Sequence, residues 1–248
     1  MTCQQKTLNL HSLKIQDAGR DSRGEYVAQQ DFSVASGQTR VYFKNLEDRL
    51  IDHINDAQIV MGCVAWLTSE PILRALAQRS TVIVVQKEDF LRPDLGSRDG
   101  WSAHLRRLYD RLKCDLVRMQ LPGGISNLSV GDGYAHAPAP SVRCVGNYNK
   151  DRIAAFPRAH HKFVIFGKIA EEDRDSQSYL ADVVKPYAVW TGSYNFTKNA
   201  GASFENAIYI TDPVIVAAYV EEFGQVFSLS EPLDWTSEWA APEYRIGT

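Results

Sequence analysis

The chain has 248 residues, of which 44% are hydrophobic, so it can bury a sizeable core in one large domain. Its 27 basic and 30 acidic residues leave a formal net charge of −3, so any polyanion must be held by a local basic patch. The N-terminal segment has no apolar signal region, and no uninterrupted apolar run approaches the roughly 18 residues of a membrane span. The sequence therefore predicts a cytoplasmic protein without membrane association.

The 4 cysteines show neither a C-x-x-C pair nor metal-ligand spacing. Cys63, Cys114 and Cys144 lie in or near apolar runs and are predicted to be reduced core thiols. No group of His, Asp or Glu has the spacing of a metal site either. The sequence thus predicts no metal and no cofactor.

Residues 1–40 are polar and weakly periodic, which predicts an extension of short strands and loops. From residue 41 a helical stripe is followed by AQIVMGCVAWL (57–67), a run typical of a buried strand. SEPILRALAQR (69–79) is predicted to be a helix with Ser69 as its N-cap.

A strand, a helix and a strand follow, predicted at STVIVVQ (80–86), DGWSAHLRRLYDRLK (99–113) and DLVRMQL (115–121). Such alternation predicts an α/β fold with a mixed, mostly parallel sheet and helices on both faces.

Residues 122–141 are rich in Gly, Pro and Ser and are predicted to be a loop of the kind that serves as a lid or binds a partner. Beyond this loop, strands are predicted at VRCVG (142–146), HKFVIFG (161–167), YAVWTGSYNF (187–196) and ENAIYIT (205–211). A final helix begins near Asp212, with a predicted core-facing stripe of Ile215, Tyr219, Phe223 and Phe227.

The segment RAHHKFVIFGK (158–168) places two histidines and a lysine at the start of a predicted buried strand. Successive side chains of a strand point to opposite faces, so His160 and Lys162 should share one face and His161 the other. A lone histidine here is more often a buried structural residue than a catalyst.

The second polar segment is TGSYNFTKNAGASFENAIYI (191–210). Strand alternation puts Ser193 and Asn195 on one face, and Glu205 stands at the start of the next strand. Taken alone, Ser-x-Asn is usually a turn cap and such a glutamate is usually a solvated rim charge.

In combination, HHKFVIFG, GSYNFT and ENAIYI resemble the phospholipase D superfamily, whose signature is H-x-K-x4-D, then G-S-x-N, then an acidic residue. The pattern is most similar to bacterial endonucleases that carry one motif copy per chain. The resemblance implies a phospholipase D-like catalytic domain over residues 41–230, with the 122–141 loop as an insertion and residues 231–248 as a tail.

The resemblance also implies roles for particular residues. His160 matches the nucleophile, Lys162 the phosphate-binding lysine, and Glu205 the carboxylate that orients the histidine. Ser193 and Asn195 match the pair that holds the non-bridging phosphate oxygens. The aspartate of the family motif falls at Gly167, a departure that bears on activity.

This chemistry agrees with the residue types. A neutral imidazole, with a reference pKa of about 6.5, can attack phosphorus without a metal. Preorganised donors then stabilise charge on the phosphoryl oxygens. The implied function is a metal-independent nuclease that forms a covalent phosphohistidine.

A leaving alkoxide must be protonated, which calls for a second histidine. Among the 6 histidines, only His160 heads a His-x-Lys pair. Superfamily members with two copies build one site between their halves. A single-copy chain is therefore expected to form a homodimer through its active-site face, with one shared site.

The stretch 141–168 contains six basic residues and one acidic residue, Asp151: Arg143, Lys150, Arg152, Arg158, Lys162 and Lys168. This local excess predicts binding of a nucleic-acid backbone, DNA or RNA, with Lys150, Arg152, Arg158, Lys168 and Lys198 as contacts. The alternative is a solvated strand edge.

Two other functions stay open at this point. One is a phospholipase or phosphatidyl-transferring enzyme, which would need an apolar acyl-binding surface. The other is a non-catalytic nucleic-acid-binding or partner-gated module, in which Gly167 reflects lost activity. The 122–141 loop and the N-terminal extension leave room for a regulatory protein partner.

Overall fold

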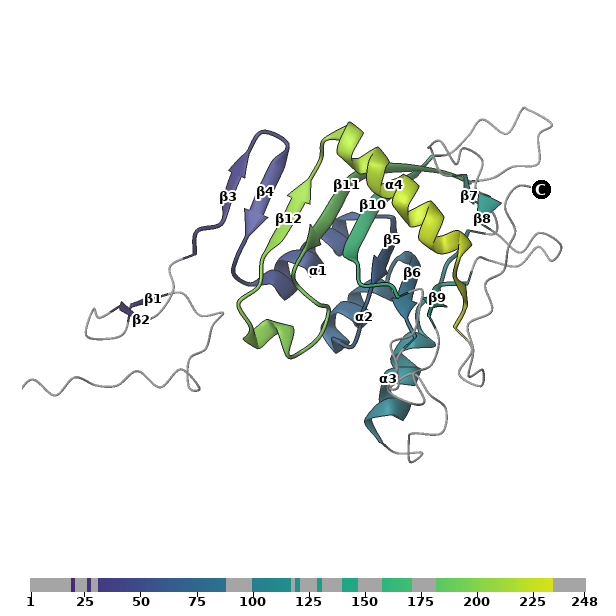
Figure 1. Cartoon of the computed structure of the whole chain (residues 1–248), viewed down its shortest axis with the longest axis horizontal. Coiled ribbons are helices and arrows are strands. Elements are labelled where there is room, and N and C mark those ends of the chain that lie inside the picture. Colours follow the sequence, from purple (N-terminus) through teal and green to yellow (C-terminus); the bar gives the residue numbers. More distant parts are fainter. Residues whose placement is uncertain are drawn as a thin grey trace, which may run out of the picture.

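The structure is a computed structural model, and it describes residues 19–20, 26–27, 31–87, 100–116, 119–120, 129–130, 140–146, 158–170 and 182–233. One large sheet dominates this part of the chain, with helices on both of its faces (Figure 1). The α/β class and the covering of both faces are confirmed.

The helices are α1 (Leu46–Asp56), α2 (Glu70–Leu76), α3 (Trp101–Tyr109) and α4 (Pro213–Ser228), with a 3-10 turn, η3 (Ala200–Ala202). The longer strands are β3 (Val34–Ser36), β4 (Thr39–Tyr42), β5 (Ile59–Val64), β6 (Ser80–Gln86), β9 (Val142–Val145), β10 (Lys162–Ala170), β11 (Asp182–Gly192) and β12 (Ala207–Ile210). The two-residue strands are β1 (Gly19–Arg20), β2 (Tyr26–Val27), β7 (Met119–Gln120), β8 (Ser129–Val130) and β13 (Glu231–Pro232).

The large sheet has the strand order β13-β9-β6-β5-β10-β11-β12-β4-β3, and β7 pairs with β11 and β8. The β5/β6, β6/β9 and β7/β11 pairs are parallel, and the other pairs are antiparallel. The prediction of a mostly parallel sheet is therefore wrong. A strand-helix-strand crossover builds the β5/β6 pair, whereas β10, β11 and β12 follow one another as antiparallel neighbours, which need no crossover helix.

One face of the sheet packs against α1, α2 and α3. Leu46, Leu50 and Ile54 form the buried stripe of α1, and they meet Val60, Val64, Val164 and Phe166 of β5 and β10 in one core. Both faces of β5 and β6 are covered, so every residue of the two strands is buried and their sequences show no alternation.

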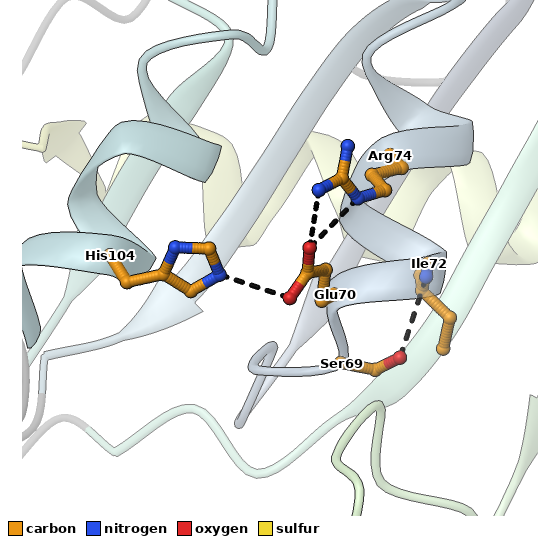
Figure 2. A network of polar contacts seen from close by, with 5 residues as sticks. All are labelled: Ser69, Glu70, Ile72, Arg74 and His104. Carbon is orange, nitrogen blue, oxygen red and sulfur yellow. Dashed lines mark hydrogen bonds and ion pairs between the residues drawn. The ribbon is translucent and has the colours of Figure 1, made fainter. Parts of the chain in front are cut away.

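The start of α2 is fixed by its cap and by ties to its neighbours (Figure 2). Ser69 Oγ accepts a hydrogen bond from the Ile72 amide, as the N-cap prediction required. Glu70 lies 2.9 Å from His104 Nε2 on α3 and 2.5 Å from Arg74 Nη2 on its own helix. Hydrogen bonds from His104 and then Arg74 lower the pKa of Glu70.

Helix α4 covers the opposite face. Asp212 caps it by accepting from the amides of Val214 and Ile215. The predicted stripe is correct at Phe223 and Phe227, but Ile215 is 41% exposed. The buried positions are Val216, Val220, Phe223, Gly224 and Phe227, because a helix of about 3.6 residues per turn keeps one face through alternating steps of four and three residues, whereas the predicted stripe steps by four throughout.

The first and last strands of the large sheet can be compared with the domain boundaries expected from the sequence. Strands β3 and β4 join the sheet beside β12, so the sheet begins at Val34, inside the range predicted as an extension. At the other end, β13 pairs with β9. Most of residues 1–30, 122–139 and 234–248 lie outside the described residues.

The predicted core thiols are confirmed for Cys63, Cys114 and Cys144, which are buried and form no disulfide. Burial raises the pKa of Cys63 and raises that of Cys144 to about 12. Cys3 lies outside the described residues. None of the described helices combines the length and apolar character needed to cross a membrane.

Candidate active site

Four strand ends meet at one edge of the sheet, the lower edge in Figure 1. Val64 at the end of β5 pairs with Lys162 at the start of β10. Phe163 pairs with Thr191 near the end of β11, and Gly192 pairs with Ala207 at the start of β12. Antiparallel pairing therefore brings the HHK, GSYN and FEN segments to the same edge, although they are far apart in sequence.

His160 and Lys162 contact one another there. The Lys162 Nζ lies 3.3 Å from His160 Nδ1 and 3.4 Å from Nε2, and it donates to the His160 carbonyl oxygen at 2.9 Å. His161 points to the α4 side, where its Nε2 lies 2.9 Å from Glu222 Oε1 and its ring packs against Phe163. The two adjacent histidines thus lie on opposite faces, as strand alternation predicts.

Ser193 and Glu205 are joined across the ends of β11 and β12. The Ser193 hydroxyl donates to Glu205 Oε2 in a short hydrogen bond and accepts one from the Asn206 amide at 3.0 Å. A Cβ on Gly192 would lie 2.3 Å from the Asn206 carbonyl oxygen, so this close approach of the two segments requires glycine. That explains the glycine of G-S-x-N in this chain.

Asn195 lies in the turn that follows Ser193. The next residue, Phe196, is buried, and its carbonyl accepts from the amides of Thr68 and Ser69, both at 2.8 Å. Asn195 Oδ1 is also buried, and it has no hydrogen-bond partner among the described residues. The turn that carries Asn195 is therefore anchored to the β5–α2 connection.

Lys162 of the HHK segment and Glu205 of the FEN segment interact electrostatically. Partial burial lowers the pKa of Lys162, and the negative charge of Glu205 acts in the opposite direction. Among the residues that the structure describes, no three His, Cys, Asp or Glu side chains are grouped so that they could hold a metal ion.

No protein-family model matches the chain. Uncharacterized protein L381 of Acanthamoeba polyphaga mimivirus is 32% identical to it over 214 residues, which cover 82% of this chain and 70% of the viral protein. The chain belongs to the same family as this viral protein. The name of this relative states no activity, so membership of the family assigns none.

Solved structures are similar to the chain at lower identity. Nuc from Salmonella typhimurium, a phospholipase D family member, is 17% identical with a TM-score of 0.44, covering 80% of this chain and 98% of Nuc. NucT from Helicobacter pylori is 14% identical with a TM-score of 0.43, covering 75% and 93%. TrmBL2, an archaeal chromatin protein that binds DNA, is 13% identical with a TM-score of 0.36, covering 81% and 56%. Superpositions this partial assign no activity, which has to be argued from the side chains of the chain itself.

Gly167, the position of the motif aspartate, lies away from the edge. It is five residues beyond Lys162 along β10, about 17 Å at the usual rise of a strand. A Cβ there would lie 2.9 Å from the side chains of both Ile59 and Val184. The departure from the motif is therefore a packing feature of this core and removes no group from the site edge.

The predicted nucleic-acid contacts divide into separate groups. Arg158, two residues before His160, and Lys198, in the turn after Asn195, are exposed near the site edge. Lys168 lies near the far end of β10, where it donates to the Asp56 carbonyl oxygen at 2.6 Å. Lys150 and Arg152 lie outside the described residues.

Arg143, which contributed to the predicted basic excess, is a core residue. It is 5% exposed, donates to Ser230 Oγ and to the Ser230 carbonyl oxygen, and lies over the Phe227 ring. Its contribution to a basic surface was therefore wrongly predicted, because the sequence could not show that its charge is used inside the fold.

Two residues near the motif histidines escaped sequence reasoning. Trp66, in the connection after β5, packs edge-on against His160 with ring centroids 5.4 Å apart. Glu222 on α4 contacts His161. The only sequence signal for Trp66 is an aromatic residue just after a buried strand, and Glu222 has no signal beyond lying in an amphipathic helix.

Proposed function

We propose that this chain is a phosphodiesterase, specifically a nuclease that forms a covalent phosphohistidine on His160. The observation that carries the proposal is the meeting of the His160–Lys162 contact and the Ser193–Glu205 pair at one sheet edge. An imidazole next to an ammonium group, with hydroxyl and amide donors nearby, is the set of groups that phosphoryl transfer uses.

The reaction would proceed in two displacements. A ring nitrogen of His160 attacks phosphorus, the phosphorus–oxygen ester bond breaks, and the leaving alkoxide takes a proton from a general acid. Water then attacks the phosphohistidine and the phosphorus–nitrogen bond breaks, which restores the imidazole. No oxidant or second substrate is needed.

Three side chains would stabilise the phosphoryl oxygens. Lys162 supplies a positive charge, and Ser193 supplies a hydroxyl. Burial of Asn195 Oδ1 supports a donor role for this residue, because it leaves the amide hydrogens on Nδ2 as the group for a phosphate oxygen. With Lys162 beside the nucleophile, we propose turnover without a metal ion.

The resemblance implies that Glu205 orients His160. The contacts of Glu205 support two further roles for this residue. It holds the Ser193 hydroxyl, and its charge favours the protonated form of Lys162 against the lowering effect of burial. Glu205 would therefore keep two phosphate-binding groups in their working state.

We further propose that two chains share one site. Each chain has one His-x-Lys pair, whereas the reaction needs a nucleophile and a proton donor. Pairing through the site edge across a two-fold axis would let His160 of one subunit attack while His160 of the partner subunit protonates the leaving oxygen.

Nucleic acid is the proposed substrate because exposed cations flank the edge. Arg158 and Lys198 lie on the two segments that carry His160 and Asn195, where they would contact phosphates next to the cleaved one. A second subunit would double these charges.

The test uses purified protein on plasmid DNA, single-stranded DNA, RNA and phosphatidylcholine vesicles, each with and without EDTA. Cleavage of nucleic acid that survives EDTA, is lost in His160→Ala and is kept in His161→Ala supports the proposal. Loss on chelation with recovery on adding Mg²⁺, or turnover of the lipid alone, contradicts it.

A further inference from the structure

Trp66 contacts both motif residues of the first segment. Its ring meets the His160 ring edge-on, with an interplanar angle of 85° and centroids 5.4 Å apart. The Lys162 Nζ lies 5.9 Å from the centroid of the same indole, within the range of a cation–π contact. One half-buried aromatic side chain therefore touches the imidazole and the ammonium group of the proposed site.

The backbone on each side of Trp66 is held firmly. The Ala65 amide donates to the His161 carbonyl oxygen at 2.8 Å, and the Leu67 carbonyl accepts from the buried Tyr109 hydroxyl at 2.6 Å. Leu67 also forms a bridge with Phe196, next to Asn195. The connection that carries Trp66 is thus tied to the His160 segment on one side and to the Asn195 turn on the other.

The helix after this connection is itself fixed. Ser69 donates to Glu47 of α1. Figure 2 shows that Ser69 also caps α2 and that Glu70 contacts His104 of α3. Neighbouring helices therefore hold the base of the connection. Such support from surrounding elements is what a side chain needs to act as a fixed wall for another group.

The position of the Lys162 ammonium group indicates what the Trp66 ring contributes at this site. The Lys162 Nζ is almost equally far from both ring nitrogens of His160, and the in-plane hydrogen-bonding directions of these two nitrogens diverge. The ammonium group therefore lies beside the ring and is not aligned for a hydrogen bond with either nitrogen. The Lys162 Nζ is held there by its hydrogen bond to the His160 carbonyl oxygen at 2.9 Å, and the aromatic ring that neighbours it besides His160 is the Trp66 indole, whose centroid lies 5.9 Å away.

We propose that Trp66 is a positioning residue of this site, which holds the His160 imidazole and the Lys162 ammonium group in their working arrangement. The inference rests on the proposed function and adds a residue that the motif does not contain. Small displacements of reacting groups can cost about 10²-fold in rate, so a residue that fixes their geometry should act mainly on kcat.

The test compares Trp66→Leu, which keeps apolar volume, with Trp66→Phe, which keeps an aromatic face. Trp101→Ala is the matched control, because Trp101 is an exposed tryptophan on α3. Each variant is measured for thermal unfolding, for kcat and KM on the nucleic acid that the wild type cleaves, and for the NMR titration of His160, assigned by comparison with His160→Gln.

We expect Trp66→Leu to lower kcat on the order of 10-fold to 100-fold with KM within about 3-fold. The same change should raise the pKa of His160, because water replaces the indole and the ammonium group moves away. Trp66→Phe should recover most of both effects, and Trp101→Ala should match the wild type.

Wild-type kcat and an unchanged His160 titration in Trp66→Leu would overturn the inference. So would equal losses in the Leu and Phe variants that only follow their unfolding temperatures, because that pattern indicates a purely structural role. If the wild type cleaves no phosphodiester, the proposed function fails, and the His160 titration in the two variants still decides whether Trp66 positions the imidazole.

Discussion

The two faces of the β10 start carry adjacent histidines in opposite settings. On one face His160 is exposed, and it contacts Lys162 and the edge of Trp66. On the other face His161 contacts Glu222 and packs on Phe163, whose ring in turn meets Tyr219 of α4. One face gathers groups suited to bind phosphate, and the other fastens a strand to a helix.

Residue type alone therefore does not separate a catalytic candidate from a packing residue. His161 has a carboxylate partner, a feature often sought beside catalytic histidines, yet that partner belongs to the helix that covers the opposite face of the sheet. The period of the strand decides which histidine meets the polar ends of β11 and β12.

The largest effect on nuclease activity is expected when the two histidines are substituted one at a time. His160→Ala is expected to reduce nuclease activity by at least about 10³-fold, because it removes the proposed nucleophile. His161→Ala should keep most of the activity. Initial rates on a fluorescent oligonucleotide measure both, with circular dichroism to check folding. Comparable losses in two folded variants would reverse the roles assigned to the two faces.

The next largest effect is expected at Gly167, in the buried part of β10 and away from the site edge, and it concerns the free energy of unfolding. Gly167→Asp restores the motif residue, but it would place a carboxylate among Ile59, Val184 and other core side chains. We expect a loss of about 3–5 kcal/mol in the free energy of unfolding, without any gain in kcat. Urea unfolding together with rate measurements checks this. A stable and faster enzyme would show that the position belongs to the site.

Two lysines of β10 provide a smaller, matched comparison. Lys162→Met should lower kcat on the order of 10²-fold, because a preorganised positive charge is removed from the phosphoryl oxygens. Lys168→Met should have little effect, since Lys168 donates to the Asp56 carbonyl oxygen near the far end of the strand. If the two variants lose equal activity at low salt and the loss relative to the wild type fades at high salt, a general electrostatic role would replace the specific one.

If two chains share one site, the activity of mixed dimers depends in a defined way on the fraction of wild-type chains. Mixing equal amounts of wild-type and His160→Ala chains by co-refolding should leave about a quarter of the activity, because only wild-type pairs contain both histidines. Independent sites would leave about half. Activity measured across a range of mixing ratios distinguishes a squared dependence on the wild-type fraction from a linear one.

The smallest effect is expected on the packing face. Glu222→Gln removes the charge that faces His161, in a pair whose side chains are each more than 40% exposed. The free energy of unfolding should fall by no more than about 1 kcal/mol, and kcat should stay unchanged. Thermal unfolding and rate measurements on the same sample check both. A large fall in kcat would make Glu222 part of the site.

Local sequence patterns were sufficient for much of the fold. The buried strands β5 and β6, the Ser69 cap and the start of α4 at Pro213 follow from apolar runs and from capping chemistry that involve only neighbouring residues. The same locality allowed His160 and Lys162 to be placed together, because a strand fixes the direction of alternate side chains. The pattern of α4 was less decisive, since Ile215 has the right chemistry for the core but is exposed.

Other features depend on long-range pairing, which no local pattern reports. Whether β10 meets its neighbours in a parallel or antiparallel sense is decided by the path of the chain through space, so the mostly parallel sheet was wrongly predicted. Arg143 bonds to Ser230, and Trp66 meets His160 only because β5 pairs with β10. The chemical groups, and the face of the strand on which each lies, could be read from local sequence. Which groups meet could be seen only in the folded chain, because contacts between distant segments depend on strand register and on the packing of the whole core.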